Sequence, residues 1–193
     1  MLFKNCYICA LKTKLKTMNE IIKKNGITFG VISGVLSILT TTIIYVVDLE
    51  LFVSPWIGLI SILIYVTLGI VLLSKTKKDL KGQFVFKEAF TTYFIFAVVG
   101  IVISVLFNII LFNYVDPSAK ETIKELSMKM MITMMQKFDA PASAVNEALK
   151  GLKENDQFSM GNLFKGGLTS ILVSSIFGLI LAAIFKTKTV TNE

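Results

Sequence analysis

Four segments of this chain are almost wholly apolar and contain no Asp, Glu, Lys or Arg: residues 27–47, 56–73, 90–112 and 167–185. An α-helix rises 1.5 Å per residue, so about 20 residues cross the roughly 30 Å hydrocarbon core of a bilayer. The hydrophobic content of 54% is high for a soluble domain of this length. We therefore predict an all-α membrane protein with four transmembrane helices in a compact bundle.

The rest of the chain divides around these spans. The predicted order is a basic segment, three spans, a long polar segment, a fourth span and a tail: residues 1–26, 27–112, 113–166, 167–185 and 186–193. The chain opens with a short apolar stretch that precedes most of its nearby lysines, without an A-x-A site, so we expect no cleaved signal peptide. Met18 is an alternative start to Met1, in which case residues 1–17 are not native.

The distribution of lysine predicts the orientation of the spans. Residues 1–26 have a net charge of +5 and residues 74–89 a net charge of +3. The turn 48–55 has a net charge of −2, and residues 113–166 are balanced. Because Lys and Arg accumulate in cytoplasmic loops, we predict that both termini are cytoplasmic and that residues 113–166 are extracytoplasmic. Since the lysines flank spans, we expect no nucleic-acid partner.

Small residues recur along the spans at intervals that place them on one helical face. The candidate helix-packing residues come from the first, third and fourth spans: Gly30, Gly34, Ser37, Gly100, Ser104, Ser170, Ser174 and Gly178. Small side chains let helix backbones approach closely, and in lipid such contact replaces the hydrophobic driving force. The stripes predict either close packing within one four-helix bundle or a dimer contact between two copies.

The third span ends in "LFNYVDPSAKE", where apolar sequence gives way to Asp116 and Pro117. Asp can cap a helix, and Pro fits the first helical position because its missing donor is not needed there. We predict a helix that starts here and runs to about Phe138. A turn at residues 139–141 and a shorter helix to about Lys150 would complete an extracytoplasmic helical hairpin between spans 3 and 4.

The first helix of this hairpin has a broad apolar face. Its candidate interaction residues are Met130, Met131, Met134 and Phe138, and we expect Met130 and Met134 to be buried. An apolar arc this wide needs more cover than one partner helix provides, and methionine suits adaptable contact surfaces. The face is interpreted either as packed on the chain's own spans and lipid, or as a docking surface for a partner.

Residue types that support catalysis or metal binding are scarce. The chain contains no His, and its two cysteines, Cys6 and Cys9, lack the further ligands that a zinc site needs. No phosphate-binding Gly-rich loop is present, and the spans lack the ionisable groups of proton or ion pathways. Asn108 is the most polar residue within a span, and we expect it to bond a neighbouring helix or its own turn. We expect no catalytic residues, no metal, no cofactor and no enzymatic activity.

Several stretches, in order, resemble one known family. They are "GITFGVISG", "GQFVFKEAF", "LFNYVDPSAKE", "MMQKFDAP" and "ENDQFS", and they resemble the family of domain of unknown function 4199, small four-span membrane proteins of Bacteroidetes-type bacteria. The resemblance covers roughly residues 18–188. It implies a multi-pass protein of the bacterial cytoplasmic membrane with an extracytoplasmic helical insert. It implies no ligand, because the family has no assigned reaction.

Two functions from different classes follow from these observations. The first is a non-enzymatic structural or partner-binding membrane protein that acts through the extracytoplasmic hairpin. The second is a small oligomeric transporter or channel component whose polar span residues line a path. The expected partners are the lipid bilayer and either a second copy or another membrane protein.

Overall fold

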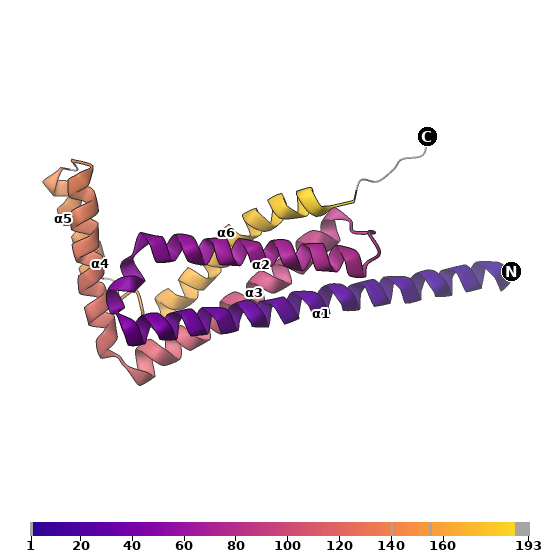
Figure 1. Ribbon diagram of the computed structural model, residues 1–193, viewed down its shortest axis with the longest axis horizontal. Helices are drawn as coiled ribbons and strands as arrows, with labels where there is room; N and C mark the ends of the chain where they lie inside the picture. The colour runs from indigo at the N-terminus through magenta and orange to yellow at the C-terminus, as the bar shows by residue number, and fades with distance from the viewer. Residues whose placement is uncertain (1, 140, 155, 188–193) are drawn as a thin grey trace. The chain divides into compact units, whose positions relative to one another are not determined.

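A computed structural model describes residues 2–139, 141–154 and 156–187, with side chains described from Asn19 onward except that of Glu154. Every regular element in these residues is a helix (Figure 1). The elements are α1 (Leu2–Val47), η1 (Leu49–Val53), α2 (Pro55–Asp79), α3 (Phe86–Ile110), η2 (Leu111–Val115), α4 (Ser118–Lys137), α5 (Ala142–Glu154) and α6 (Met160–Phe185). The prediction of an all-helical chain is confirmed.

Four helical stretches are long and apolar enough to cross a membrane: Asn19–Val47, Pro55–Asp79, Phe86–Val115 and Met160–Phe185. Each contains one of the four apolar segments found in the sequence, and together they indicate a multi-pass membrane protein. The helices are longer than the apolar segments because backbone hydrogen bonding continues into polar turns. The last turn of α2, for example, includes Lys77 and Lys78.

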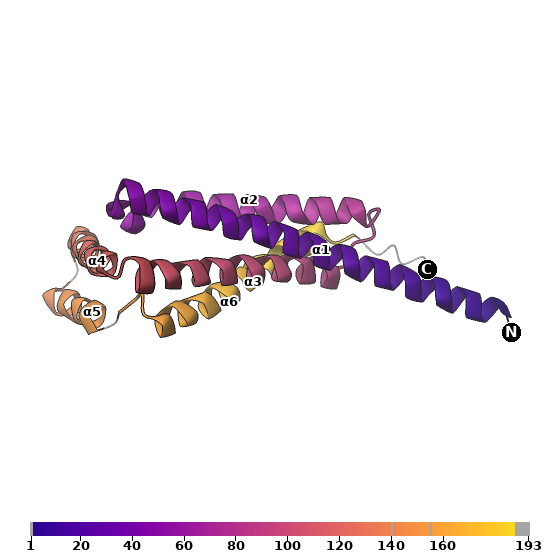
Figure 2. The same ribbon diagram turned by 90° about the horizontal axis from the view of Figure 1, so that it is seen from below.

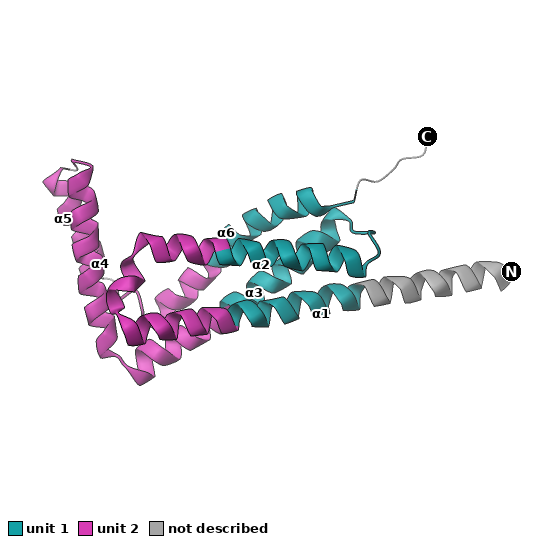
Figure 3. Ribbon diagram, viewed as in Figure 1, with its two compact units in different colours: residues 1–34, 64–101, 170–193 teal, residues 35–63, 102–169 magenta. Residues whose placement is uncertain are grey.

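Packing divides the chain into two compact units, which are described separately (Figure 3). Unit 1 comprises Met1–Gly34, Ile64–Ile101 and Ser170–Glu193, and unit 2 comprises Val35–Leu63 and Val102–Thr169. The helices α1, α2, α3 and α6 contribute residues to both units.

The core of unit 1 surrounds the side chain of Tyr93 on α3, which is 0% exposed. Its ring lies between two glycines, because a Cβ atom built on Gly69 of α2 or on Gly178 of α6 would come within 2.7 or 2.6 Å of the ring. The rings of Tyr65 and Phe96 complete the cluster, with centroids 6.4 and 5.5 Å from that of Tyr93. The absence of side chains on the two glycines makes room for this aromatic ring.

Glycine also allows α1 and α3 to approach closely in unit 1. A Cβ atom on Gly30 would lie 2.7 Å from the Cβ of Val99 and 3.0 Å from the carbonyl oxygen of Phe96. A Cβ atom on Gly100 would collide with the hydroxyl of Ser33. Contact this close maximises dispersion between backbones, which is what holds helices together in lipid.

The remaining helix-packing residues named above have varied surroundings. Gly34 is buried and Ser170 is exposed. In unit 1 the Ser174 hydroxyl lies 3.4 Å from that of Tyr65, and in unit 2 the hydroxyls of Ser37 and Ser104 are 2.9 Å apart.

The core of unit 2 centres on Phe112, which is 0% exposed. Its ring packs edge-on against Phe52 of η1, with centroids 5.7 Å apart. It also packs against Phe158 ahead of α6, where the two rings are tilted by 45° and their centroids are 4.4 Å apart. Ala119 and Ile123 from the first turns of α4 are buried in the same cluster. The first half of α4 is therefore seated on η1 and η2.

Candidate interaction surface

The exit from α3 is a π-helical turn, η2, that sets the position of the α4 and α5 segment. The amide of Asp116 donates to the carbonyl of Leu111 at 2.8 Å, which closes the wider turn. Leu111 and Phe112 are buried inside it. Single π turns recur at functional sites because they re-aim the following residues. Here the turn precedes the polar residues that hold α4.

Asp116 caps α4. Its carboxylate accepts from the amides of Ser118 at 3.0 Å and Ala119 at 3.2 Å, and from the Ser118 hydroxyl. Pro117 precedes the helix with helical dihedral angles. The prediction that Asp116 caps the helix is confirmed, although α4 begins at Ser118, one residue after the predicted Pro117. The first-turn donors find an acceptor.

A phenol from another helix reaches the same carboxylate. The Tyr45 hydroxyl at the end of α1 donates to Asp116 at 2.8 Å. The hydrogen bonds from Ser118 and then from Tyr45 stabilise the ionised form and hold the pKa of Asp116 below its ordinary value of 3.8. Asp116 therefore joins α1, α3 and α4 while it remains charged.

Asn113 and Lys120 tie the start of α4 to the segment that leads into α6. The Asn113 side chain donates to the carbonyl of Phe158 at 3.0 Å. The Lys120 ammonium lies 3.4 Å from the Asp156 carboxylate and 3.4 Å from the Asn113 side-chain oxygen. Asp156 also accepts from the amide of Phe158 at 2.9 Å. These bonds fix the loop beside Phe112.

Along α4 the apolar face becomes progressively exposed. Ile123 is 2% exposed, Met130 is half-buried, Met134 is 46% exposed and Phe138 is 79% exposed. The expectation that Met134 is buried is wrong, because η1 and η2 cover only the first half of α4. Met131, on the flank of the same face, is half-buried.

The helix α5 covers one flank of α4. The two helices pack against each other and lie side by side where both are seen nearly end-on (Figure 2). The Lys124 ammonium donates to the carbonyl of Lys153 at 2.8 Å. The inner side of α5, with Val145, Ala148 and Leu149, is half-buried. This contact leaves Met134 and Phe138 exposed.

No metal-binding arrangement is present among the residues with described side chains, where no three His, Cys, Asp or Glu side chains come together. Cys6 and Cys9 lie outside those residues. The Asn108 side chain donates to the carbonyl of Ser104 at 2.8 Å, one turn earlier on its own helix.

The sequence did not indicate two contacts of this region. Nothing in it paired Tyr45 with Asp116. Asn113 and Phe158 are 45 residues apart, so local patterns could not predict their hydrogen bond.

Comparison with known proteins returned one family. Residues 28–187 match the family described as "Protein of unknown function (DUF4199)". No curated protein matches the chain, and no solved structure does.

Proposed function

Because the chain belongs to the DUF4199 family, whose function is unknown, we propose a function from its own geometry. The protein is a non-enzymatic structural or partner-binding protein of a bacterial cytoplasmic membrane. Its α4 and α5 helices form an extracytoplasmic hairpin, and the hairpin docks on a further membrane component through the exposed end of the α4 face.

One observation supports this proposal most directly. The apolar face of α4 begins at a buried residue, Ile123, and ends at Met134 and Phe138, which are 46% and 79% exposed. Exposed apolar side chains that continue a buried face lower the free energy when another surface covers them. The polar network of Asp116, Asn113 and Lys120 holds the helix that presents this face.

The surroundings of the polar span residues favour this role over a transport path. The hydroxyls of Ser33, Thr76 and Thr92 donate to carbonyls of their own helices at 2.7–3.0 Å. Ser33, Thr76 and Thr92 are buried. A hydroxyl that donates to its own backbone has no free donor to offer a polar path.

The orientation is tested by cysteine labelling. Ser143 near the start of α5 is exposed. After Cys6 and Cys9 are replaced, a Ser143→Cys variant should react with a membrane-impermeant maleimide in intact spheroplasts. Labelling that requires lysis would overturn the extracytoplasmic placement.

The docking role is tested by photo-crosslinking in intact cells. A benzoylphenylalanine at Met134 or Phe138 should form adducts with protein or lipid, because these side chains face a second surface. The matched control is the same photoreactive residue at Glu125, which is exposed on the polar arc of α4. Equal and weak yields at the three positions would overturn the proposal.

A further inference from the structure

The exposed part of the apolar α4 face continues a surface that is buried at Ile123, where it packs in the Phe112 cluster. Ile123, Met130 and Met134 are seven and four residues apart, so they lie on one narrow arc of a helix with 3.6 residues per turn. Ile123 packs with Phe112 and Phe52 at the end of the unit 2 spans. The same arc therefore points toward the span side along the whole of α4.

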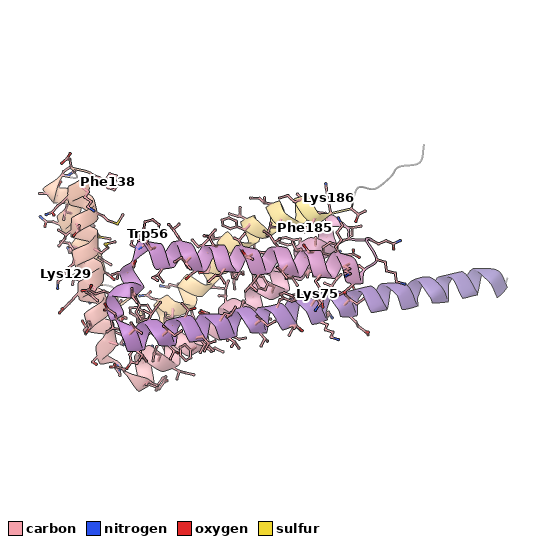
Figure 4. The ribbon with its side chains drawn as sticks, viewed as in Figure 1. Trp56, Lys75, Lys129, Phe138, Phe185 and Lys186 are labelled. Atoms are coloured by element: carbon pink, nitrogen blue, oxygen red, sulfur yellow. The ribbon has the colours of Figure 1, made fainter. Side chains whose placement is uncertain are left out.

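The direction of α4 sets what that arc meets beyond the spans. Within unit 2, α4 runs crosswise to the segments of α1 and α2 (Figure 3). Phe138 lies on the side of α4 that faces these segments, and Lys129 lies on the opposite side (Figure 4). A helix that runs across the ends of transmembrane segments lies parallel to the membrane plane. Its span-side face then meets the bilayer where the protein's own helices end.

The first turn of α2 marks the level of that bilayer surface. Trp56 is 74% exposed, and Leu59 and Leu63, further along α2, are 54% and 66% exposed. Tryptophan concentrates at membrane interfaces, whereas leucine faces the acyl chains. Trp56 lies on the span side of α4, as Phe138 does (Figure 4).

We propose that the outer half of α4 is an in-plane interfacial helix whose Met130, Met134 and Phe138 side chains insert into the outer leaflet around the protein. The occupant of the face is thus lipid, at the boundary between headgroups and acyl chains. This inference rests on the proposed function, because it names the membrane component on which the α4 face docks. Lys129, on the side of α4 opposite Phe138, is exposed, and its charge stays in water. Lys137 lies near the apolar arc, seven residues after Met130, and its long side chain brings its charge up to the headgroups. Exposed apolar side chains on one side and a charged side chain on the other are the arrangement of a helix that lies in a membrane interface.

The test measures the depth of a single tryptophan in the full chain reconstituted in lipid vesicles. Trp56, the only tryptophan, is replaced by Phe, and Phe138→Trp or Met134→Trp is introduced. The vesicles contain phosphatidylcholine brominated either near the headgroup or near the end of the acyl chain. Aqueous iodide reports exposure to water. The control is Gln136→Trp, because Gln136 is exposed on the polar arc.

The expected result is severalfold stronger quenching by the shallow bromine at positions 138 and 134 than at position 136, with the reverse order for iodide. If none of these reagents quenches positions 138 and 134, protein covers the face. That result overturns the lipid inference and leaves the docking function intact. If iodide quenches all three positions equally and bromine none, the face lies in water and the lipid inference fails. The docking function is then decided by the crosslinking at Met134 and Phe138 in cells.

Discussion

Unit 1 and unit 2 use stretches of the same four long helices but hold them together by different means. In unit 1 the backbones close up through glycine, and an aromatic ring fills the slot between Gly69 and Gly178. In unit 2 a charged carboxylate, Asp116, and an amide, Asn113, bridge elements that are far apart in the sequence. Close backbone contact through glycine marks the first unit, whereas in the second unit the hydrogen bonds of Asp116 and Asn113 accompany the packing of Phe112.

The two units also differ in their balance of Lys and acidic residues. Residues 19–34, 64–101 and 170–187 of unit 1 contain eight Lys and three acidic residues, whereas unit 2 contains seven Lys and nine acidic residues. An excess of lysine is typical of the cytoplasmic ends of spans. The described residues of unit 1 are therefore net basic, whereas unit 2 is net acidic.

The largest effect should come from removing the aromatic centre of unit 2. Phe112→Ala deletes a fully buried ring that packs against Phe52 and Phe158. Large-to-small changes of this kind cost about 3–5 kcal/mol, so α4 should detach from η1. Limited trypsin digestion should then cut faster at Lys124, whose side chain in the wild type is half-buried and donates to the carbonyl of Lys153. Phe164→Ala on α6, where the ring is 55% exposed, is the control and should leave the pattern unchanged.

The next effect contrasts two glycines on one helix. A Cβ atom on Gly178 would lie 2.6 Å from the Tyr93 ring, whereas one on Gly166 would meet nothing within 4 Å. Gly178→Ala should destabilise the protein by about 1–3 kcal/mol through overpacking. Gly166→Ala should be neutral or stabilising by up to about 1 kcal/mol, because alanine favours helix. Unfolding in mixed detergent measures both, and equal effects would show that the Tyr93 slot is not tight.

These glycines also show how far the sequence could predict the fold. The small residues at Gly30, Gly100 and Gly178 indicated close approach, since only their spacing along a helix mattered for that inference. The sequence could not show that Gly178 faces the ring of Tyr93 and not another small residue, because partner choice depends on the rotation of each helix. It also gave no sign that Ser170, in the same stripe, is exposed.

In the α4 region local chemistry was predictable and distant pairing was not. The cap at Asp116 depends on three consecutive residues, which the sequence displays directly. The burial of the Met134 side chain depends on how far η1 extends along α4. The width of the apolar face in the sequence does not reveal this extent. The sequence therefore defined the candidate face, and the structure shows which part of it the chain leaves exposed.

A smaller effect of opposite sign is expected in unit 1. The Tyr93 hydroxyl is buried and has no hydrogen-bond partner among the described residues. An unpaired buried hydroxyl costs about 1–3 kcal/mol, so Tyr93→Phe should stabilise the protein by up to that amount. Tyr65→Phe should not stabilise it, because Tyr65 accepts from Ser174. Thermal unfolding in detergent compares the variants, and a loss of stability in Tyr93→Phe would mean that its hydroxyl is paired.

The smallest effect should be a dependence of α4 docking on acid, confined to unit 2. The pKa of Asp116 is held below 3.8 by hydrogen bonds from Ser118 and Tyr45. A carboxyl whose folded pKa is depressed contributes stability that is fully present above its unfolded pKa and is lost as pH falls through the folded value. Cleavage of α4 by pepsin should therefore rise on acidification below about pH 4, where an ordinary Asp takes up its proton.

The Asp116→Asn variant separates this carboxyl from the other acidic groups of unit 2. The amide carries no charge at any pH. Above about pH 4, pepsin should therefore cut α4 of the variant faster than α4 of the wild type. In stronger acid the two cleavage rates should converge. Tyr45→Phe removes one donor from the carboxylate and should shift the wild-type transition to higher pH, because the folded pKa then moves back toward its ordinary value. If wild type and Asp116→Asn kept the same difference across the whole range, ionised Asp116 would not be what fastens α4, and the contrast between the two units would reduce to the packing of Phe112.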